Sequence, residues 1–373
     1  AGMGATKIRC WFARSRHTVE ALFNEERSKL NLAYWQEMEK RLDYALNKYP
    51  GIIFQLIPFA EDDQELFRFR NGDFISRKAV DYMQARWSAY PNVTYCISND
   101  RDVNGREDLK RAVSYIGEAM KKQEPWGTLI TNHQKRYEGY AFVGEPWSDI
   151  ITLEDIDQVH GLKVLEYRER GNDPVVLDED RYENWRNPSH DRYYFRRLIW
   201  ANLLSGGHPT YGGLRTYESY VDDRTPKGIL GYYSANENGL LEKGAHDFIH
   251  IHGFFLDKDL DLVNWIPSDS LAGNDPAIVK CIRNGDRYIV YLQNPDDPGN
   301  HAKANVSDSI PEAVMNLKEA AYQLNWYCPR TGTWYETDTM QGRRNTRLQA
   351  PGDKDWVLFL ARMDQKMLTK HAE

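Results

Sequence analysis

Acidic side chains that follow apolar runs are the residues of this sequence best placed to do chemistry. Asp100 follows the run Val93–Ile97, and Glu179 follows the run Pro174–Leu177. Two facing carboxylates can cleave a glycosidic bond, because one protonates the leaving oxygen while the other attacks the anomeric carbon or activates water. Their surroundings must hold the two pKa values apart. Acidic residues in loops are more often solvated surface, so the spacing alone makes this pair a hypothesis.

Polar and aromatic side chains near the ends of other runs are candidates for binding a sugar. A sugar ring offers hydroxyls to polar groups and an apolar C–H face to aromatic rings, and the chain has 11 Trp and 23 Tyr. The tryptophans in loops are predicted to stack on a ring, although packing of a long loop explains them equally well. The candidate substrate-binding residues are Asp62, His133, Asp149, Tyr211, Trp147, Trp185 and Arg14. For the polar ones, a hydrogen bond without any substrate is an equally good interpretation.

Alternating strands and helices must position these residues. The first two-thirds of the chain alternates short apolar runs with amphipathic stretches, which is typical of a (β/α)8 TIM-type barrel, whose working side chains follow the carboxyl ends of the strands. The predicted strands are Ile8–Ala13, Ile52–Pro58, Val93–Ile97, Leu129–Thr131, Asp149–Leu153, Pro174–Leu177 and His208–Gly212. The predicted helices are Tyr34–Tyr49, Arg77–Tyr90, Glu107–Lys122, Ile156–Arg168, Asp191–Leu204 and Gly244–Leu260. Seven predicted strands are one fewer than a barrel needs, so either one strand was not recognised or the first strand is missing from this chain, and we expect the latter.

The pattern changes after Pro267, where short β-type runs alternate with turns rich in Gly, Pro, Asn and Asp. This spacing predicts a small antiparallel β-sandwich. The predicted domains are therefore a catalytic barrel over residues 1–270 and a β-sandwich over residues 276–373. Four cysteines are far apart in the sequence, and the pattern leaves open whether Cys281 and Cys328 pair.

Several motifs resemble one family when they are taken in order. The stretch Pro174–Glu183 resembles the P-V-L-x-x-E-P-R-Y-E motif of the apiosidase-like glycoside hydrolases, and Ser98–Arg101 lies where these enzymes have G-G-D-R. Ser205–Gly207 and Thr210–Gly213 resemble the family's last helix and strand. The segment Ala350–Leu358 resembles the end of the β-sandwich that follows them, a module labelled as collagen-binding.

The resemblance implies that Asp100 is the general acid/base and Glu179 the nucleophile of a glycosidase. We expect retention of the anomeric configuration, because the acids after the fourth and seventh strands of such barrels usually lie close together, whereas a separation of about 8 Å would favour inversion. The substrate would be an oligo- or polysaccharide or its side chains. Asp180 stands where the family has Pro, and Ser98-Asn99 replace its two glycines, which would reshape the neighbouring subsite. The acidic neighbours of Glu179 would raise its pKa, so we expect an arginine, Arg181 or Arg101, close to it.

Two other functions stay open beside hydrolysis. A barrel that has lost activity could hold a glycan as a carbohydrate-binding protein. Alternatively, the β-sandwich could bind collagen or another matrix protein, although packing on the barrel explains it more simply. The sequence does not indicate an oligomeric state.

The remaining patterns exclude other partners. The net charge of −7 is spread along the chain without a basic cluster for nucleic acid, and no apolar run is long enough for a membrane. The pair His246 and His250 resembles a zinc-protease helix, but Asp247 replaces the usual glutamate and no third ligand follows at the expected spacing. We therefore expect no metal and no cofactor. Polysaccharide enzymes work outside the cytoplasm, so we expect a secreted or periplasmic protein, although no leader is present to support this.

Overall fold

A computed structural model describes residues 4–11, 19–59, 62–182, 190–213, 244–273, 275–300 and 304–363. The chain divides into two compact units, Ala1–Asp155 with Glu169–Asp178, and Ile156–Arg168 with Glu179–Glu373. The predicted domains, 1–270 and 276–373, stay a prediction, because this division follows contacts within each unit rather than the order of the chain.

The first unit is built on a parallel sheet. Strands β1 (Lys7–Trp11), β2 (Ile53–Ile57), β3 (Val93–Cys96) and β4 (Ile130–Thr131) pair in that order. All residues of β3 and β4 are buried, as expected for parallel strands that are covered on both faces. Two further strands are β5 (Ile151–Glu154) and β6 (Val175–Glu179), where the backbone N–H of Ile151 donates to Pro174 O at 2.9 Å.

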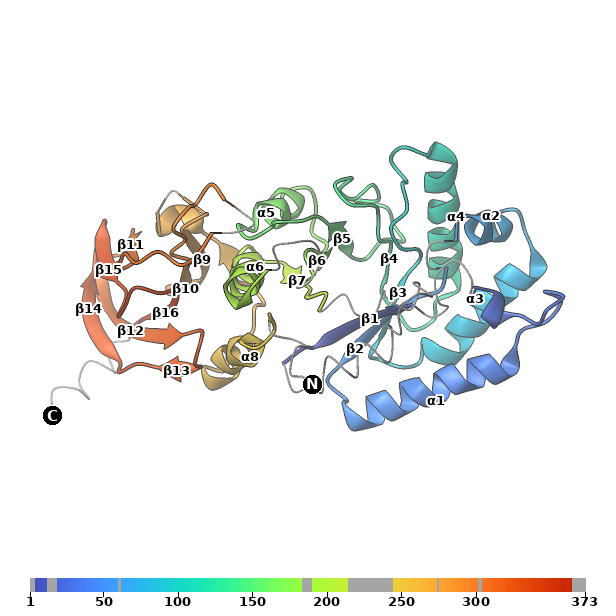
Figure 1. The fold of residues 1–373 in the computed structure, drawn as a ribbon, viewed down its shortest axis with the longest axis horizontal. Coiled ribbons are helices and arrows are strands. Elements are labelled where there is room, and N and C mark those ends of the chain that lie inside the picture. The colour runs from blue at the N-terminus through green and yellow to red at the C-terminus, as the bar shows by residue number, and fades with distance from the viewer. Residues whose placement is uncertain are drawn as a thin grey trace, which may run out of the picture. The chain divides into compact units, whose positions relative to one another are not determined.

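Helices connect the parallel strands of this unit and lie beside the sheet in Figure 1. They are α1 (Leu32–Lys48), α2 (Asp63–Arg70), α3 (Phe74–Trp87) and α4 (Glu107–Gln123). In α4 the buried residues recur every three or four positions, so one stripe of the helix faces the core: Leu109, Ala112, Val113, Ile116, Gly117 and Met120. The sequence did not predict α2, a short helix that is mostly polar.

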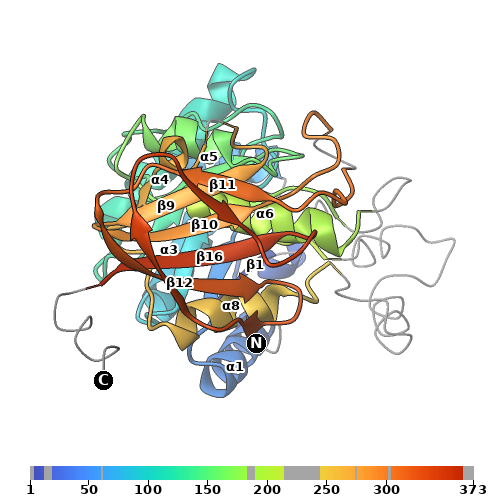
Figure 2. The ribbon, with the colours of Figure 1, turned by 90° about the vertical axis from the view of Figure 1, so that its left-hand side faces the viewer.

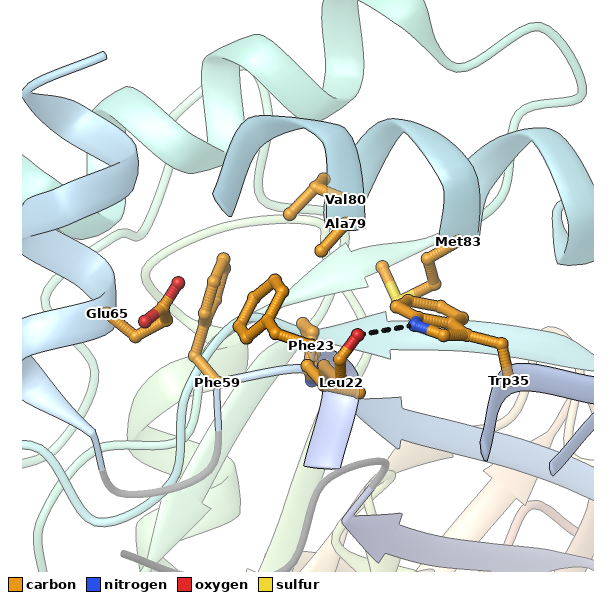
Figure 3. Close-up of a pocket in the computed structure, with 9 residues that line it drawn as sticks. Leu22, Phe23, Trp35, Phe59, Glu65, Ala79, Val80 and Met83 are labelled. Carbon is orange, nitrogen blue, oxygen red and sulfur yellow. Dashed lines mark hydrogen bonds between the residues drawn. The ribbon is translucent and has the colours of Figure 1, made fainter. Parts of the chain in front are cut away.

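A small cavity lies among the side chains of this helical layer. It is lined mainly by apolar groups, including Phe23, Trp35 and Met83, and the Trp35 indole N–H donates to Leu22 O at 3.0 Å (Figure 3). Its volume of about 10 Å³ is enough for one water molecule at most. This cavity is therefore a packing defect of the core and not a ligand site.

The second unit contains antiparallel sheets. The larger sheet has the order β13-β12-β16-β10-β9-β8, with β14 also paired to β12, and the smaller sheet pairs β11 with β15. Figure 2 shows β9, β10, β16 and β12 side by side. The strands are β8 (Ile266–Pro267), β9 (Val279–Asn284), β10 (Arg287–Leu292), β11 (Glu312–Met315), β12 (Ala320–Cys328), β13 (Thr333–Trp334), β14 (Asp338–Gly342), β15 (Thr346–Gln349) and β16 (Trp356–Arg362).

Both faces of the larger sheet are buried within this unit. One face shares a core with the smaller sheet, through residues such as Val290, Leu358, Met315 and Leu348. The other face contacts two helices, α6 (Arg192–Leu204) and α8 (Phe248–Asp257), and this core contains Trp200, Phe254, Ile289, Tyr291 and Phe359. Helix α5 (Leu162–Arg168), the short β7 (His208–Pro209) and the 3-10 helix η3 (Asp269–Leu271) complete the described elements of the unit.

The predicted succession of domains is confirmed: an α/β domain with parallel strands precedes an antiparallel β-sheet domain. Helix α8 is shorter than the predicted Gly244–Leu260, and β5 begins two residues later than predicted. All four cysteines are free, so Cys281 and Cys328 are not paired. No helix in the described ranges combines the length and apolar character that a membrane crossing requires.

Candidate active site

Asp100 lies just beyond the carboxyl end of β3, in a left-handed backbone conformation with φ of +49°. Aspartate tolerates this conformation better than most residues. Two residues earlier, Ser98 is bound to the segment after β4, because its backbone N–H and its hydroxyl both donate to Asn132 Oδ1, at 3.1 and 2.7 Å. The chain therefore turns sharply at Asp100 and holds its carboxylate at the end of the parallel sheet.

His133 lies close to this carboxylate. It follows β4, its side chain is completely buried, and its Nδ1 lies 3.0 Å from Asp100 Oδ1. Burial by itself would raise the pKa of Asp100, but the contacts with His133 and Glu154 and the positive charge of Arg9 together outweigh burial and lower the pKa to about 2. The predicted candidates Asp100 and His133 are thus brought together within one unit, and Asp100 is ionised at neutral pH.

Glu154 completes this cluster and was missed in the sequence. It is the last residue of β5, it is buried, and its Oε2 lies 3.9 Å from His133 Nδ1. Arg136 forms an ion pair with its Oε1 at 2.6 Å. The signal was available, because Glu154 directly follows the apolar run that ends at Leu153.

Glu179 is the last residue of β6 and is buried, with 8% of its surface exposed. The Tyr182 hydroxyl donates a hydrogen bond to its Oε1 at 2.5 Å. The Tyr182 ring in turn lies against Gly212, where an added Cβ would come within 2.5 Å of the ring. A glycine at position 212 therefore leaves the space that Tyr182 needs to reach Glu179.

Two acidic neighbours of Glu179, Asp178 and Asp180, have polar partners of different kinds. Burial opposes ionisation of Asp178, but Lys7 at 2.7 Å and Arg9 at 3.4 Å bring its pKa well below the usual range. Asp180 accepts hydrogen bonds from backbone N–H groups and from the Tyr194 hydroxyl.

The two arginines expected near Glu179 form ion pairs with other carboxylates. Arg181 binds Asp157, with Nη2 at 2.6 Å from Oδ2, and Arg101 binds Asp63, with Nη1 at 2.9 Å from Oδ1.

Two of the predicted sugar contacts have structural roles. Asp149 precedes β5, so it lies at the opposite end of that strand from Glu154. It binds Lys121 Nζ at 2.6 Å and accepts the backbone N–H of Ile130 at 2.9 Å. Trp147 is 1% exposed, and its ring covers Gly117 of α4 so closely that a Cβ there would lie 2.2 Å away. Both side chains therefore have contacts within the protein, and sugar binding by either of them stays a prediction.

The contacts of the other sugar-binding candidates do not decide whether they bind a sugar. Asp62 is the N-cap of α2 and accepts the backbone N–H of Glu65 at 3.1 Å. The Tyr211 ring is half-buried between Phe195 and Phe248, in edge contacts with centroids 5.1 and 5.2 Å away. Sugar binding by these two residues stays a prediction. Arg14 and Trp185 lie outside the described residues.

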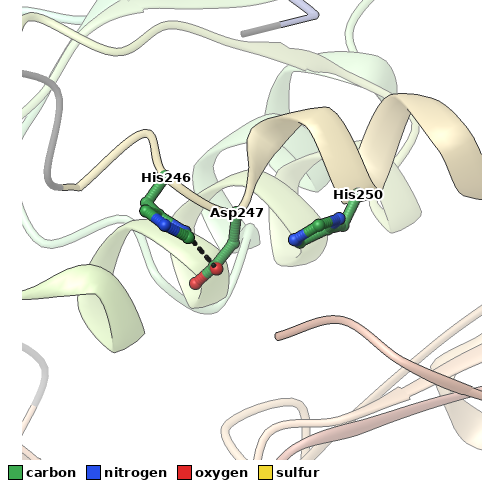
Figure 4. Close-up of side chains that lie close together, drawn as sticks. All are labelled: His246, Asp247 and His250. Atoms are coloured by element: carbon green, nitrogen blue, oxygen red, sulfur yellow. Dashed lines mark hydrogen bonds and ion pairs between the residues drawn. The ribbon is translucent and has the colours of Figure 1, made fainter. Parts of the chain in front are cut away.

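The histidine pair noted in the sequence lies at the start of α8 (Figure 4). His246 Nδ1 is 3.2 Å from Asp247 Oδ1, and His250 is one turn further on. Both oxygens of Asp247 are already bound by guanidinium groups, because Arg192 contacts Oδ1 and Arg196 contacts Oδ2 at 2.7 Å. A divalent cation would have to compete with two fixed positive charges, so the chemistry of this cluster does not suit a metal.

Comparison with solved structures relates this fold to glycoside hydrolases. A glycoside hydrolase family 5 structure from Bacteroides vulgatus ATCC 8482 shares 13% identity, with a TM-score of 0.74 over 97% of this chain and 83% of the other. A structure titled only "Glycoside hydrolase" shares 15% identity, with a TM-score of 0.64 over 97% of this chain and 86% of the other. A structure titled "putative glycoside hydrolase" from the same Bacteroides strain shares 14% identity, with a TM-score of 0.66 over 97% of this chain and 74% of the other. At these identities the likeness shows the fold alone.

Family models match most of the sequence, whereas no curated protein matches it. Residues 272–361 match the "Putative collagen-binding domain of a collagenase". Residues 11–261, about two-thirds of the chain, match the family described as "Apiosidase-like, catalytic domain". The chain therefore belongs to the apiosidase-like family and has a glycoside hydrolase fold.

Proposed function

We propose that the protein hydrolyses a glycosidic bond in an oligo- or polysaccharide, with Asp100 and Glu179 as the carboxylate pair. One observation carries the proposal. Each carboxylate stands at the carboxyl end of a strand with its own side-chain partner, His133 for Asp100 and Tyr182 for Glu179. Barrel enzymes place their catalytic groups at these strand ends.

The first step requires a proton for the leaving oxygen. A pKa of about 2 makes Asp100 a carboxylate in the free protein, whereas a general acid must carry a proton. His133 resolves this difference, because its Nδ1 is 3.0 Å from the carboxylate and a single proton can be shared by the two groups. In the proposal the Asp100–His133 pair holds this proton, and Asp100 delivers it to the glycosidic oxygen as the C–O bond breaks.

Glu179 takes the other role in the same step. Its carboxylate oxygen bonds to the anomeric carbon as the alcohol leaves, which gives a glycosyl-enzyme ester. Asp100 then accepts a proton from water, which attacks the anomeric carbon and releases Glu179. The Tyr182 hydroxyl donates to Oε1 of Glu179 and so orients the carboxylate. Two displacements at one carbon retain the anomeric configuration.

Hydrolysis is tested with a variant that keeps the shape of the site. Glu179→Gln should lose at least roughly 10³-fold in activity on a panel of 4-nitrophenyl glycosides and on plant, algal and microbial polysaccharides, since it removes the nucleophile. Binding of any polysaccharide that the wild type cleaves should persist in affinity electrophoresis. Glu166→Gln is the matched control, because this α5 glutamate has a side chain that is 43% exposed.

The outcomes of this test separate the possible functions. A wild-type protein that binds polysaccharide without cleaving it would replace the proposal with a carbohydrate-binding function. Full activity in Glu179→Gln would reject the catalytic assignment. Since polysaccharides lie outside the cytoplasm, we also propose a secreted or periplasmic location, which cell fractionation with an antibody tests.

A further inference from the structure

Asp180, which directly follows Glu179, is buried, with 2% of its surface exposed. Its Oδ1 accepts the backbone N–H groups of Asp157 at 3.2 Å and of Arg181 at 2.6 Å. Its Oδ2 accepts the backbone N–H of Gln158 at 3.0 Å. Both carboxylate oxygens of Asp180 therefore accept hydrogen bonds from backbone N–H groups of the protein.

The loop that supplies two of these donors is shaped to receive an anion. Asp157 adopts φ of +61°, and the consecutive N–H groups of Asp157 and Gln158 converge on one carboxylate. Such converging backbone amides form an anion-binding nest. Arg181 also contacts this loop, because its guanidinium binds the Asp157 carboxylate at 2.9 and 2.6 Å. Residues 180 and 181 are thus both tied to the loop at 157–158.

Helix α6 adds a third contact. The Tyr194 hydroxyl donates to Asp180 Oδ1, and the Tyr194 ring stacks on His190 with centroids 4.2 Å apart. Burial raises the pKa of Asp180 to about 6, the nearby charge of Asp157 acts in the same direction, and the hydrogen bonds from Tyr194, Gln158 and Arg181 oppose the rise. Arg181 carries the positive charge that faces this group, and it is paired with Asp157.

We propose that Asp180 is a positioning residue for Glu179: its carboxylate, seated in the nest at 157–158, fixes the turn that aims the Glu179 carboxylate. The inference rests on the proposed function of Glu179. The mechanical link is short, since the side chains of residues 180 and 181 anchor the turn while that of Tyr182 holds Glu179. A carboxylate that loses its alignment by about 1 Å can lose roughly 10²-fold in rate.

Asp180→Asn tests the anchor with almost no change of shape. Both oxygens of Asp180 accept backbone N–H groups, so the NH2 group of asparagine would face an N–H donor at either position and lose that hydrogen bond. We expect kcat to fall roughly 10²-fold with KM within about threefold, because the substrate contacts are kept. Asp247→Asn is the matched control, since Asp247 is also a buried, paired carboxylate of the same unit. It should lower the melting temperature without lowering kcat per folded molecule.

A crystal structure of Asp180→Asn separates this inference from the proposed function. We expect the Glu179 carboxylate to have left the Tyr182 hydroxyl. Unchanged kcat with Glu179 still bonded to Tyr182 would overturn the inference, even if the melting temperature falls. Should Glu179→Gln retain activity, the proposed function fails, and the position of Glu179 in Asp180→Asn still decides whether Asp180 positions it.

Tyr194→Phe provides a second variant if Asp180→Asn does not fold. Removing the hydroxyl takes away a hydrogen bond that lowers the pKa of Asp180, so the carboxylate accepts a proton at higher pH. The acid limb of the kcat–pH profile should then move to higher pH. A limb that stays in place, with unchanged kcat, would overturn the inference.

Discussion

Arg196 should be one of the most costly side chains to remove from this protein. Its guanidinium binds Asp355 with two hydrogen bonds of 2.9 Å each and Asp247 with one of 2.7 Å. Both carboxylates are completely buried. Arg196→Met keeps the apolar stem of the side chain but leaves two buried negative charges with fewer partners. Breaking a buried pair in this way costs about 3–5 kcal/mol.

The expected change in melting temperature follows from the chain length. An unfolding entropy of about 2.1 cal/mol/K per residue gives roughly 0.8 kcal/mol/K for 373 residues, so the loss corresponds to about 4–6 °C. Differential scanning calorimetry at pH 7 measures this shift.

Arg192→Met is the control, because Arg192 binds the same Asp247 from the same helix with a side chain that is 42% exposed. It should lower the free energy of unfolding by about 1 kcal/mol, since solvent screens the pair. A shift below about 1 °C in Arg196→Met, or equal shifts in the two variants, would refute this account of the buried network.

Two further predictions test the acid and the packing of the first unit. His133→Gln keeps a hydrogen-bond donor for Asp100 but removes the ionisable proton. Hydrolysis of glycosides with alkyl or sugar leaving groups should therefore fall roughly 10²–10⁴-fold, while hydrolysis of 4-nitrophenyl glycosides should fall much less. Equal losses for the two kinds of leaving group in steady-state assays would contradict the shared proton. Gly117→Ala adds a Cβ 2.2 Å from the Trp147 ring, so it should lower the free energy of unfolding by about 1–3 kcal/mol, measured by guanidinium denaturation. Gly127→Ala, at a glycine with open space around it but φ of +72°, is a comparison in which only backbone strain acts.

The sequence predicted the order of strands and helices because its apolar periodicity is local. The run Ile150–Leu153 has an acid on each side, Asp149 and Glu154. Chain direction places only Glu154 at the carboxyl end of the strand, whereas Asp149 ends up beside Lys121 at the other end. The predicted strand ended at Leu153, one residue before the end of β5, so Glu154 was not recognised as a strand-end residue.

Long-range polar contacts could not be read from the sequence. Helix α6 buries two arginines, and the partner of Arg196 is Asp355, 159 residues further along the chain. The role of Asp180 depends in the same way on a loop conformation at Asp157 that local propensity does not reveal. Polar groups of this kind are placed by tertiary structure, since their partners become neighbours only after folding.

The most direct test of the central claim is the distance between the carboxyl carbons of Asp100 and Glu179 in a crystal structure. We predict about 5–5.5 Å, the separation found in retaining glycosidases. A value of about 6.5–9.5 Å would keep hydrolysis but replace retention with inversion. Carboxylates that point apart, or that are separated by much more than about 10 Å, would contradict the assignment of these two residues as a catalytic pair.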